Sequence, residues 1–170
     1  MVLRQLLKAA NYMHSKGILH RDIKSGNALL KAGLKVKLAD FGFATYAKPD
    51  GSVENYNVGS PAYMSPEAYY YSQYSAKSDT WALGMVLYEM LAGGQPFVDS
   101  SYETILQYIA SGRLLAGLTW ISPTARYLLE RMFFLDPLGR ADTNEILGSL
   151  NAHEISKGLT RGPVPRQSRF

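Results

Sequence analysis

The stretch SDTWALGMVLYEMLAGG, residues 78–94, gives the clearest fold signal in the sequence. Apolar residues lie on nearly every side of a helix drawn through it, Ser78 or Asp79 is suited to cap its first turn, and glycines follow its last turn. A helix that is apolar on all sides is buried. We therefore expect a buried central helix around which the rest of the domain packs.

Shorter amphipathic helices are predicted on both sides of this central helix. Upstream, apolar residues recur at three-residue and four-residue steps from residue 3 to residue 13, and Lys16 and Gly17 are typical of a helix end. Downstream, the same periodicity predicts helices over 102–110, 123–134 and 142–147. The sequence thus predicts a mainly α fold, a helical bundle around a buried central helix.

Two short strand-like runs follow the first helix. Residues 28–31 and 35–38 are separated by three residues that include Gly33, which is the spacing of a β-hairpin. The charged stretch HRDIKSGN, residues 20–27, precedes the hairpin and lies between apolar runs that favour burial. We call it the HRD loop and expect its polar side chains to be held in place, as chemistry requires.

Composition and length indicate one soluble globular domain. The chain has 170 residues, 46% hydrophobic and 19% charged, which is long enough to bury a substantial core. No apolar run reaches the ~20 residues of a membrane span, so we expect no transmembrane segment and a cytoplasmic location. The absence of cysteine excludes disulfides and thiolate metal sites.

The net charge of +4 is concentrated in residues 151–170, where four basic residues accompany one acidic residue. Such a tail could contact nucleic acid or anionic lipid. Its prolines, glycines and weak apolar periodicity favour a solvated, disordered end instead. We expect a domain over 1–150, a basic disordered tail over 151–170, and no nucleic-acid partner.

Three oxygen-bearing side chains lie in loops at one edge of the predicted hairpin. Asp22 and Asn27 belong to the HRD loop, and Asp40 follows the second strand. Carboxylate and amide oxygens are ligands that Mg²⁺ accepts, often together with phosphates. The pattern therefore predicts a general base beside a magnesium site.

Five motifs together resemble the C-terminal lobe of a eukaryotic protein kinase. They are HRD with Asn27 five residues later, DFG at 40–42, SPE at 65–67, SDTWALG at 78–84, and Arg140 within DPLGRAD. The resemblance covers about residues 2–150. It implies a protein-kinase-like C-terminal lobe whose short hairpin follows the catalytic loop.

The resemblance implies roles for the polar residues around the hairpin. Asp22 resembles the catalytic base, and Lys24 resembles the lysine that meets the transferred phosphate of ATP. Asn27 and Asp40 resemble the Mg²⁺ ligands, and Leu29 resembles the contact to adenine. ATP and Mg²⁺ are the cofactors implied.

The type of substrate is also implied by resemblance. Lys24, and Ser60 before a proline, resemble the serine/threonine class, and the motifs look most like the autophagy-initiating kinases and their relatives. Glu89 stands where some kinases meet a substrate arginine, so Ser60 and Glu89 are the predicted substrate-pocket residues. Gly26 replaces the acidic residue that such kinases carry, which argues against a strong preference for arginine.

Regulation and packing are implied at further positions. Arg21 resembles the arginine that pairs with a phosphate on the long loop, residues 39–65, whose candidate hydroxyls are Thr45, Ser52 and Tyr56. Structural roles are implied for His20, Phe41, Gly42, Glu67, Asp79, Trp81 and Arg140. His20 is expected to stack on Phe41, Glu67 to pair with Arg140 in the interior, and Asp79 to cap the HRD loop. A zinc site from His14, His20 and Asp22 is the less favoured alternative, since no further ligand completes it.

No glycine-rich loop and no ATP-binding lysine of the V-A-I-K type occur in the sequence. We therefore expect the N-terminal lobe to be absent from this chain and the isolated chain to be inactive. One interpretation is a partial serine/threonine kinase whose complete form, with the N-terminal lobe, phosphorylates protein Ser/Thr hydroxyls. The alternative is a non-catalytic, kinase-like binding or regulatory module.

Overall fold

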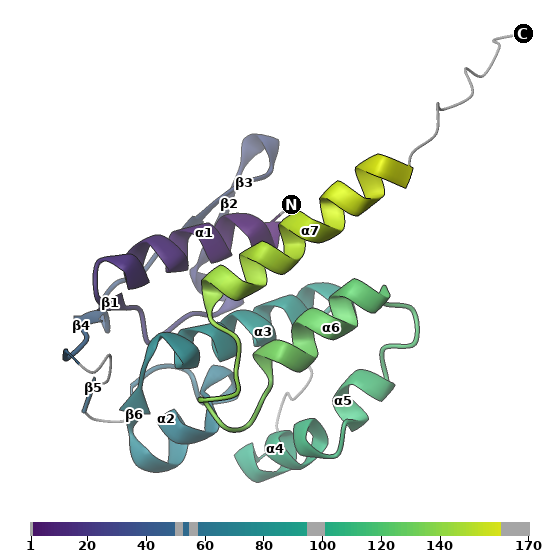
Figure 1. Cartoon of the computed structure of the whole chain (residues 1–170). Coiled ribbons are helices and arrows are strands. Elements are labelled where there is room, and N and C mark those ends of the chain that lie inside the picture. Colours follow the sequence, from purple (N-terminus) through teal and green to yellow (C-terminus); the bar gives the residue numbers. More distant parts are fainter. Residues whose placement is uncertain (1, 50–52, 55–57, 95–100, 161–170) are drawn as a thin grey trace, which may run out of the picture.

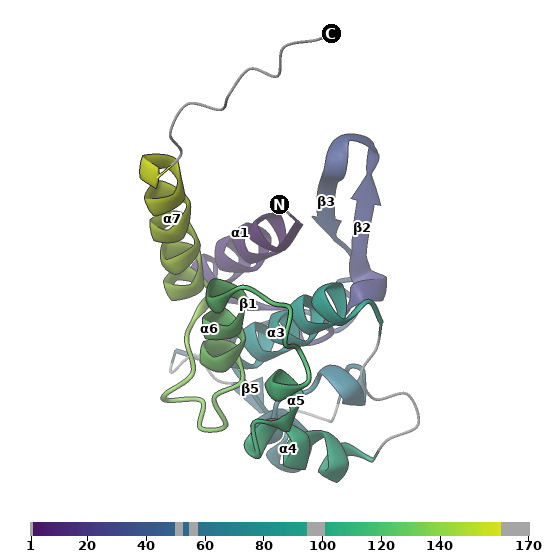
Figure 2. The same ribbon diagram turned by 90° about the vertical axis from the view of Figure 1, so that its right-hand side faces the viewer.

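The computed structural model of the protein describes residues 2–49, 53–54, 58–94 and 101–160, with side chains as far as residue 153. Its α-helices are α1 (Val2–Ser15), α2 (Pro66–Tyr71), α3 (Ala76–Ala92), α4 (Tyr102–Ala110), α5 (Arg113–Ala116), α6 (Pro123–Met132) and α7 (Thr143–Thr160). Helix α3 lies in the middle, with α1 and α7 on one side, α2, α4 and α5 on the other, and α6 beside it (Figures 1 and 2). The mainly α bundle around a central helix is confirmed.

Helix α3 is the core of the domain, because every residue from Ser78 to Tyr88 is buried. Its first turn differs from the prediction that Ser78 or Asp79 is the cap. Ser75 is the N-cap: its hydroxyl accepts from the Lys77 amide (3.2 Å), and the Ser78 hydroxyl accepts from the Ser75 amide (3.1 Å). The helix therefore begins three residues earlier, and Asp79 is left to make contacts outside it.

Helices α1 and α6 pack directly on α3. The apolar stripe of α1 is buried as its periodicity predicts: Leu3, Leu6, Leu7, Ala10 and Met13. At Gly84 of α3, a Cβ atom would lie 2.9 Å from the Phe133 ring and 3.0 Å from Met132 Cβ. Glycine is needed here because the last turn of α6 approaches the α3 backbone.

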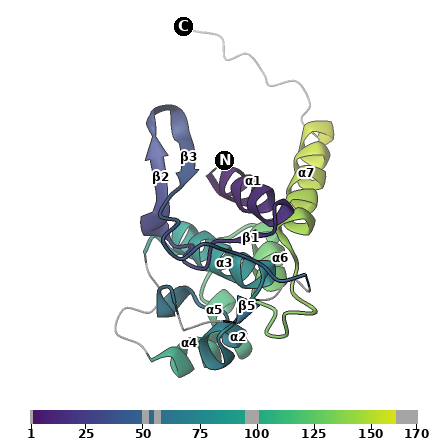
Figure 3. The ribbon, with the colours of Figure 1, turned by 90° about the vertical axis from the view of Figure 1, so that its left-hand side faces the viewer.

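The strands form three two-stranded antiparallel pairs among the described residues. They are β1 (Ile18–Leu19) with β4 (Thr45–Tyr46), β2 (Ala28–Lys31) with β3 (Lys35–Leu38), and β5 (Val53–Glu54) with β6 (Gln73–Tyr74). The β2–β3 hairpin has the predicted bounds and projects beyond α3 beside α1 (Figures 2 and 3). It places the HRD loop and Asp40 at its base.

The long loop is more ordered than its sequence indicates. Within residues 39–65, β4 pairs with β1, β5 pairs with β6, and a 3₁₀ helix, η3, spans Pro61–Tyr63. Each strand here is two residues long and pairs outside the loop, so no local period could reveal it. Residues 50–52 and 55–57 lie outside the described part.

Helix α7 is longer than predicted. It continues to Thr160, past residue 147, where the periodicity ends, and into the segment 151–170 that the sequence predicts to be disordered. A contact to another helix supports this extension: the Thr124 hydroxyl of α6 lies 2.8 Å from His153 Nδ1. Apolar periodicity within one segment cannot predict such a contact. Residues 161–170 lie outside the described part. Across the residues that are described, no helix combines the length and apolarity needed to cross a membrane.

Candidate active site

Asp79 of α3 anchors the backbone of the HRD loop. Its Oδ2 accepts from the His20 amide (2.9 Å), and its Oδ1 accepts from the Arg21 amide (3.0 Å). Arg21 has a left-handed φ of 66°, a conformation that residues with a side chain rarely adopt. The buried carboxylate holds this strained residue, so the central helix fixes the loop that precedes Asp22.

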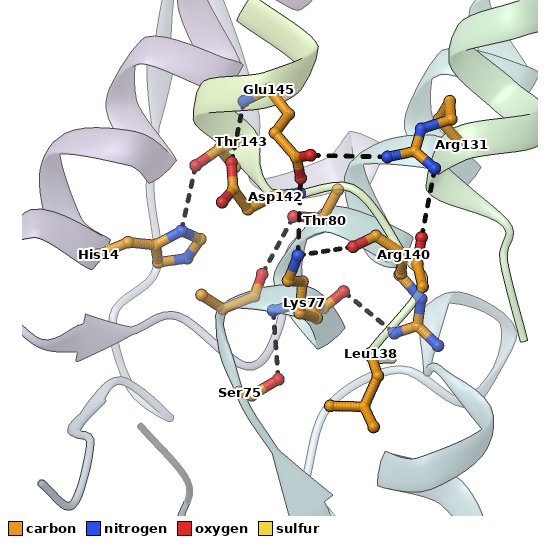
Figure 4. Close-up of polar contacts among 12 residues, drawn as sticks. His14, Ser75, Lys77, Thr80, Arg131, Leu138, Arg140, Asp142, Thr143 and Glu145 are labelled. Carbon is orange, nitrogen blue, oxygen red and sulfur yellow. Dashed lines mark hydrogen bonds and ion pairs between the residues drawn. The ribbon is translucent and has the colours of Figure 1, made fainter. Parts of the chain in front are cut away.

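His14 of α1 supports this anchor, a role that the sequence did not predict, since His14 was considered there only as a zinc ligand. Its Nε2 donates to Asp79 Oδ2 (2.8 Å). Its Nδ1 lies 3.3 Å from Thr143 Oγ1 of α7, and Figure 4 shows this second contact. A signal existed, because His14 lies four residues after Ala10 on the buried stripe of α1. Three helices thus meet at the base of the HRD loop.

The two histidines of the zinc alternative have other partners. His14 contacts Asp79, whereas His20 Nε2 donates to the Ala39 carbonyl (3.1 Å) and His20 Nδ1 accepts from the Asp22 amide (3.3 Å). In the described part of the chain, no group of three or more His, Cys, Asp or Glu side chains could hold a metal ion. The zinc reading is therefore wrong for these residues. His20 also packs against Phe41, with 5.1 Å between ring centroids.

Three donors converge on the carboxylate of Asp22, which is only 4% exposed. Asp22 Oδ2 lies 2.9 Å from Lys24 Nζ and accepts from Asn27 Nδ2 (3.1 Å). Asp22 Oδ1 accepts from the Ser60 hydroxyl (3.1 Å), which in turn accepts from Lys24 Nζ (2.9 Å). The four side chains form one closed network that joins the HRD loop to the segment before η3.

Gly59 allows these two segments to meet. Its φ is 103°, and a Cβ atom there would lie 2.5 Å from the Arg21 carbonyl oxygen. Any side chain would push the segment that carries Ser60 away from Asp22. The sequence reasoning singled out Ser60 but gave no role to Gly59.

Asn27 and Asp40 lie at the same end of the hairpin. The backbone carbonyl of Asn27 accepts from the Ala39 amide (2.9 Å), directly after the register pair Ala28 and Leu38. Asp40 has a φ of 62°, and its Oδ1 accepts from the Gly42 amide (3.2 Å). Within the described residues, Asn27 Oδ1 and Asp40 Oδ2 accept no hydrogen bond. One amide oxygen and one carboxylate oxygen therefore remain for a cation, and these are atoms that suit Mg²⁺.

The predicted adenine contact is exposed, and the predicted regulatory arginine is partly buried. Leu29 of β2 is opposite Lys37 and 52% exposed, which leaves an apolar surface free for a ligand. Arg21 Nε donates to the Phe43 carbonyl (2.7 Å), and its Nη1 is buried without a hydrogen-bond partner among the described residues. Thr45 is half-buried in β4. Ser52 and Tyr56 lie outside the described residues.

Glu89, a predicted substrate contact, already has an internal partner. The Tyr63 hydroxyl donates a short hydrogen bond to Glu89 Oε1, and the Ser25 hydroxyl lies 3.0 Å from the same Tyr63 oxygen. This network joins the HRD loop, η3 and α3. Tyr63 was not foreseen as part of it, because its two partners lie 38 and 26 residues away in the sequence.

Glu67 and Arg140 form a bidentate ion pair in the interior, with Nη1 to Oε1 at 2.6 Å and Nη2 to Oε2 at 2.9 Å. The guanidinium is 4.9 Å from the centroid of the buried Trp81 ring. Its other donors reach the carbonyl groups of Phe134, Lys77 and Leu135. Burial alone would raise the pKa of Glu67, but Arg140 outweighs it through hydrogen bonds and charge and holds that pKa below its ordinary value of 4.5.

A partly exposed polar cluster lies beside Arg140 (Figure 4). Lys77 Nζ donates to the Arg140 carbonyl (2.6 Å) and lies 3.6 Å from Glu145. Arg131 lies 3.5 Å from the same glutamate and donates to the Gly139 carbonyl (3.3 Å). The cluster ties α3, α6 and α7 to the loop that carries Arg140.

The lowered pKa of Glu67 predicts an acid-sensitive fold. Because this pKa is depressed, the pair contributes its full stability above about pH 4.5 and loses it as the pH falls through the folded-state pKa. Urea unfolding of Glu67→Gln should therefore show a smaller loss of unfolding free energy than wild type between about pH 5 and pH 3. The half-exposed Glu145→Gln serves as the control and should follow wild type. Equal losses in all three proteins would contradict the prediction.

The family model of the protein kinase domain matches residues 1–150. The chain is 40% identical over 145 residues to CBL-interacting protein kinase 29 of Oryza sativa subsp. japonica. It is 35% identical over 166 residues to inactive serine/threonine-protein kinase PLK5 of Mus musculus, and 37% identical over 170 residues to serine/threonine-protein kinase PAK mbt of Drosophila melanogaster. These matches cover 85%, 98% and 99% of this chain but 32%, 27% and 27% of the relatives.

The chain thus spans about a third or less of the length of these relatives. None of these three relatives is named as an autophagy-initiating kinase, and the resemblance to that group stays a prediction. The match over residues 1–150 includes the whole Asp22 network, both predicted Mg²⁺ ligands and the buried Glu67–Arg140 pair. On this match and this geometry, the chain belongs to the protein kinase family, with the fold of its C-terminal lobe.

Proposed function

We propose that the full-length protein is a serine/threonine kinase that transfers the γ-phosphoryl group of ATP to protein hydroxyls. The observation that carries this proposal is the buried Asp22 carboxylate, on which Lys24, Asn27 and Ser60 converge. The donors on Asp22 are all side chains, one of them is a lysine, and Lys24 and Ser60 are hydrogen-bonded to each other. The structural Asp79 differs, because two of its three donors are backbone amides.

In this proposal Asp22 orients the substrate hydroxyl and accepts its proton. The hydroxyl oxygen forms a bond to the γ-phosphorus while the bond from that phosphorus to the ADP oxygen breaks. Lys24, whose ammonium is 2.9 Å from Asp22, stabilises the negative charge on the phosphoryl oxygens. Ser60 is hydrogen-bonded to both side chains and so keeps the Lys24 ammonium close to the Asp22 carboxylate.

Asn27 and Asp40 would hold Mg²⁺, since each has an oxygen that accepts no hydrogen bond in the described part of the chain. Bound Mg²⁺ neutralises charge on the phosphate oxygens. The exposed Leu29 would contact the adenine ring, and the roof of the nucleotide site would come from an N-terminal lobe of the full-length protein. We also propose a cytoplasmic location for that protein.

Two finer proposals concern the substrate and regulation. Because the Tyr63 hydroxyl already donates a hydrogen bond to Glu89, we propose that Glu89 fixes the substrate-facing segment and does not select a substrate arginine. Arg21 Nη1 is buried and has no hydrogen-bond partner in the described part of the chain, which supports a phosphate on the loop as the regulatory signal. Thr45, Ser52 and Tyr56 remain the proposed acceptors of that phosphate.

A non-catalytic module is the second candidate function. One specific observation favours it: the murine relative that matches 98% of this chain is named an inactive serine/threonine-protein kinase. The same backbone could be retained as a binding scaffold. Phosphoryl transfer by the full-length protein separates the two functions.

The test is a magnesium-dependent transfer assay on the full-length protein. Radiolabelled phosphate should pass from ATP to a generic protein substrate, and Asp40→Asn should lower kcat by about 100-fold or more, because a charge that stabilises the transition state is lost. Raising the Mg²⁺ concentration should restore part of the rate. Asp142→Asn is the matched control, since asparagine also caps helices and Asp142 contacts only the start of α7. No transfer by wild type under any Mg²⁺ concentration would favour the non-catalytic module.

A further inference from the structure

Leu34, at the tip of the β2–β3 hairpin, combines a left-handed backbone with an exposed apolar side chain. Its φ is 57°, and the residue is 67% exposed. Glycine and asparagine favour this conformation, and leucine does not. Gln5 of α1 holds it in place: its Nε2 donates to the Leu34 carbonyl (2.8 Å), and its Oε1 accepts from the Val36 amide (3.0 Å). The tip therefore presents a fixed apolar side chain to solvent.

Three exposed lysines share one face of the same hairpin. Lys31 of β2 is the register partner of Lys35 of β3, and Lys37 lies two residues further along β3. Alternate residues of a strand point to the same face, so the three ammonium groups lie together. Residues 28–38 contain no acidic residue. We call Lys31, Lys35, Lys37 and Leu34 the basic hairpin face.

Two features of this face oppose the stability of the hairpin. Like charges directly opposite each other, here Lys31 and Lys35, destabilise an antiparallel pair. A leucine in the left-handed region adds backbone strain, and its exposed side chain gains little burial. Gln5 holds the strained backbone of the tip, but among the described residues no hydrogen bond or ion pair compensates the three lysine charges, and the Leu34 side chain stays exposed. Local features that oppose folding are typical of surfaces that bind something.

We propose that the basic hairpin face binds an acidic peptide segment of a partner protein, one that also carries an apolar residue. Its carboxylates would pair with the lysines, and its apolar side chain would cover Leu34. The proposal does not depend on phosphoryl transfer, because none of the four residues belongs to the Asp22 network. It adds a docking surface to the side of the molecule that carries the hairpin.

The charge pattern argues against two other occupants. A second copy of this chain would bring lysine against lysine, and lysines on exposed strands discourage such pairing. Anionic membranes are typically bound by clusters of about four to eight basic residues, and this face has fewer. An acidic peptide satisfies both the charge and the apolar side chain at the tip. The other exposed apolar residue of this face, Leu29 opposite Lys37, is the proposed adenine contact and is not part of the docking surface.

The test measures binding of a fluorescein-labelled peptide in which glutamate alternates with valine, by fluorescence anisotropy with the full-length protein. Wild type should bind it, more weakly as salt is raised. Leu34→Asn should weaken binding by about tenfold, because an apolar contact is lost. Its melting temperature should stay equal or rise, because asparagine tolerates the left-handed backbone. A loss of binding with an unchanged or higher melting temperature cannot come from misfolding.

Lys35→Glu provides the second variant. It should also weaken binding about tenfold or more, while the introduced carboxylate faces Lys31 and removes the like-charge repulsion. The matched control is Arg113→Glu on α5, which makes the same charge change at an exposed position far from the hairpin (Figures 1 and 2). This control should bind the peptide as wild type does.

Several outcomes would overturn the proposal. Wild-type affinity in both hairpin variants would show that the peptide binds elsewhere. Equal weakening by Arg113→Glu would reduce the effect to net charge. Binding to phosphatidylserine vesicles without binding to the peptide would identify a membrane surface, and self-association abolished by Lys35→Glu would identify a second copy as the occupant.

Discussion

Asp22→Asn in the full-length protein is expected to lower kcat for phosphoryl transfer by about 100-fold to 10,000-fold, the usual contribution of a general base. Asparagine has the same shape as aspartate but cannot accept the proton of the substrate hydroxyl. The backbone around it should be retained, because Asn27 Nδ2 also donates to the Asp22 carbonyl (2.8 Å) and Asp79 holds the preceding amides. The KM for ATP should change little, since Asp22 is not assigned to the nucleotide.

Two measurements make this result specific. Urea unfolding should give similar free energies for Asp22→Asn and wild type, which excludes misfolding as the cause of lost turnover. Ser60→Ala, which removes one hydrogen bond to Asp22 but leaves its charge, should show a much smaller loss of kcat. Asp136→Asn, on the loop after α6, should match wild type. Substantial turnover in Asp22→Asn would remove Asp22 from its proposed role.

The local elements were predictable from sequence wherever local physics dominates them. The α1 stripe, the β2–β3 hairpin and α4 have the expected bounds, because each follows from spacing within a single segment. The start of α3 was misplaced because Ser75 and Ser78 are both good caps, and the capping box uses both of them. Local pattern could not choose between the two serines.

Contacts between distant segments account for what the sequence did not predict. β4 and β5 are two residues long and pair outside their loop, and residues 151–153 of α7 are supported from α6. The HRD loop residues were found through their motif, which lies within one short stretch. The contact between His14 and Asp79 was not predicted, because the two residues are 65 positions apart and only the folded chain shows that they meet.

The buried ion pair between Glu67 and Arg140 connects the loop after α6 to α2, a helix that is far from it in the sequence. Arg140 is 1% exposed and uses all five of its N–H donors, two on Glu67 and three on backbone carbonyls. The pair therefore holds together α2, the first turn of α3 and the loop before α7. Phosphoryl-transfer chemistry does not enter this contact, so its removal should act on stability first.

Arg140→Ala is accordingly expected to lower the free energy of unfolding by about 3–5 kcal/mol, because it leaves the buried Glu67 carboxylate without its charged partner. The Ser78 hydroxyl also donates to Glu67 Oε1 (2.9 Å), but it is neutral and cannot replace that charge. Whole domains are stable by only about 5–15 kcal/mol, so this loss is a large fraction of the total stability. Arg131→Ala is the matched control: the side chains of Arg131 and Glu145 are 36% and 51% exposed, and their pair should contribute no more than about 1 kcal/mol. Urea unfolding of both variants measures the difference.

The double variant Arg140→Met with Glu67→Leu separates the two causes of the loss. If the unpaired carboxylate dominates, replacing both partners by apolar residues should recover more than half of the stability lost in Arg140→Ala, since buried ion pairs can often be replaced in this way. If the three unsatisfied carbonyl groups of Phe134, Lys77 and Leu135 dominate, the double variant should stay near the single one. A loss of less than about 1 kcal/mol in Arg140→Ala would contradict both accounts, because a guanidinium with five internal partners would then contribute no more than an exposed pair.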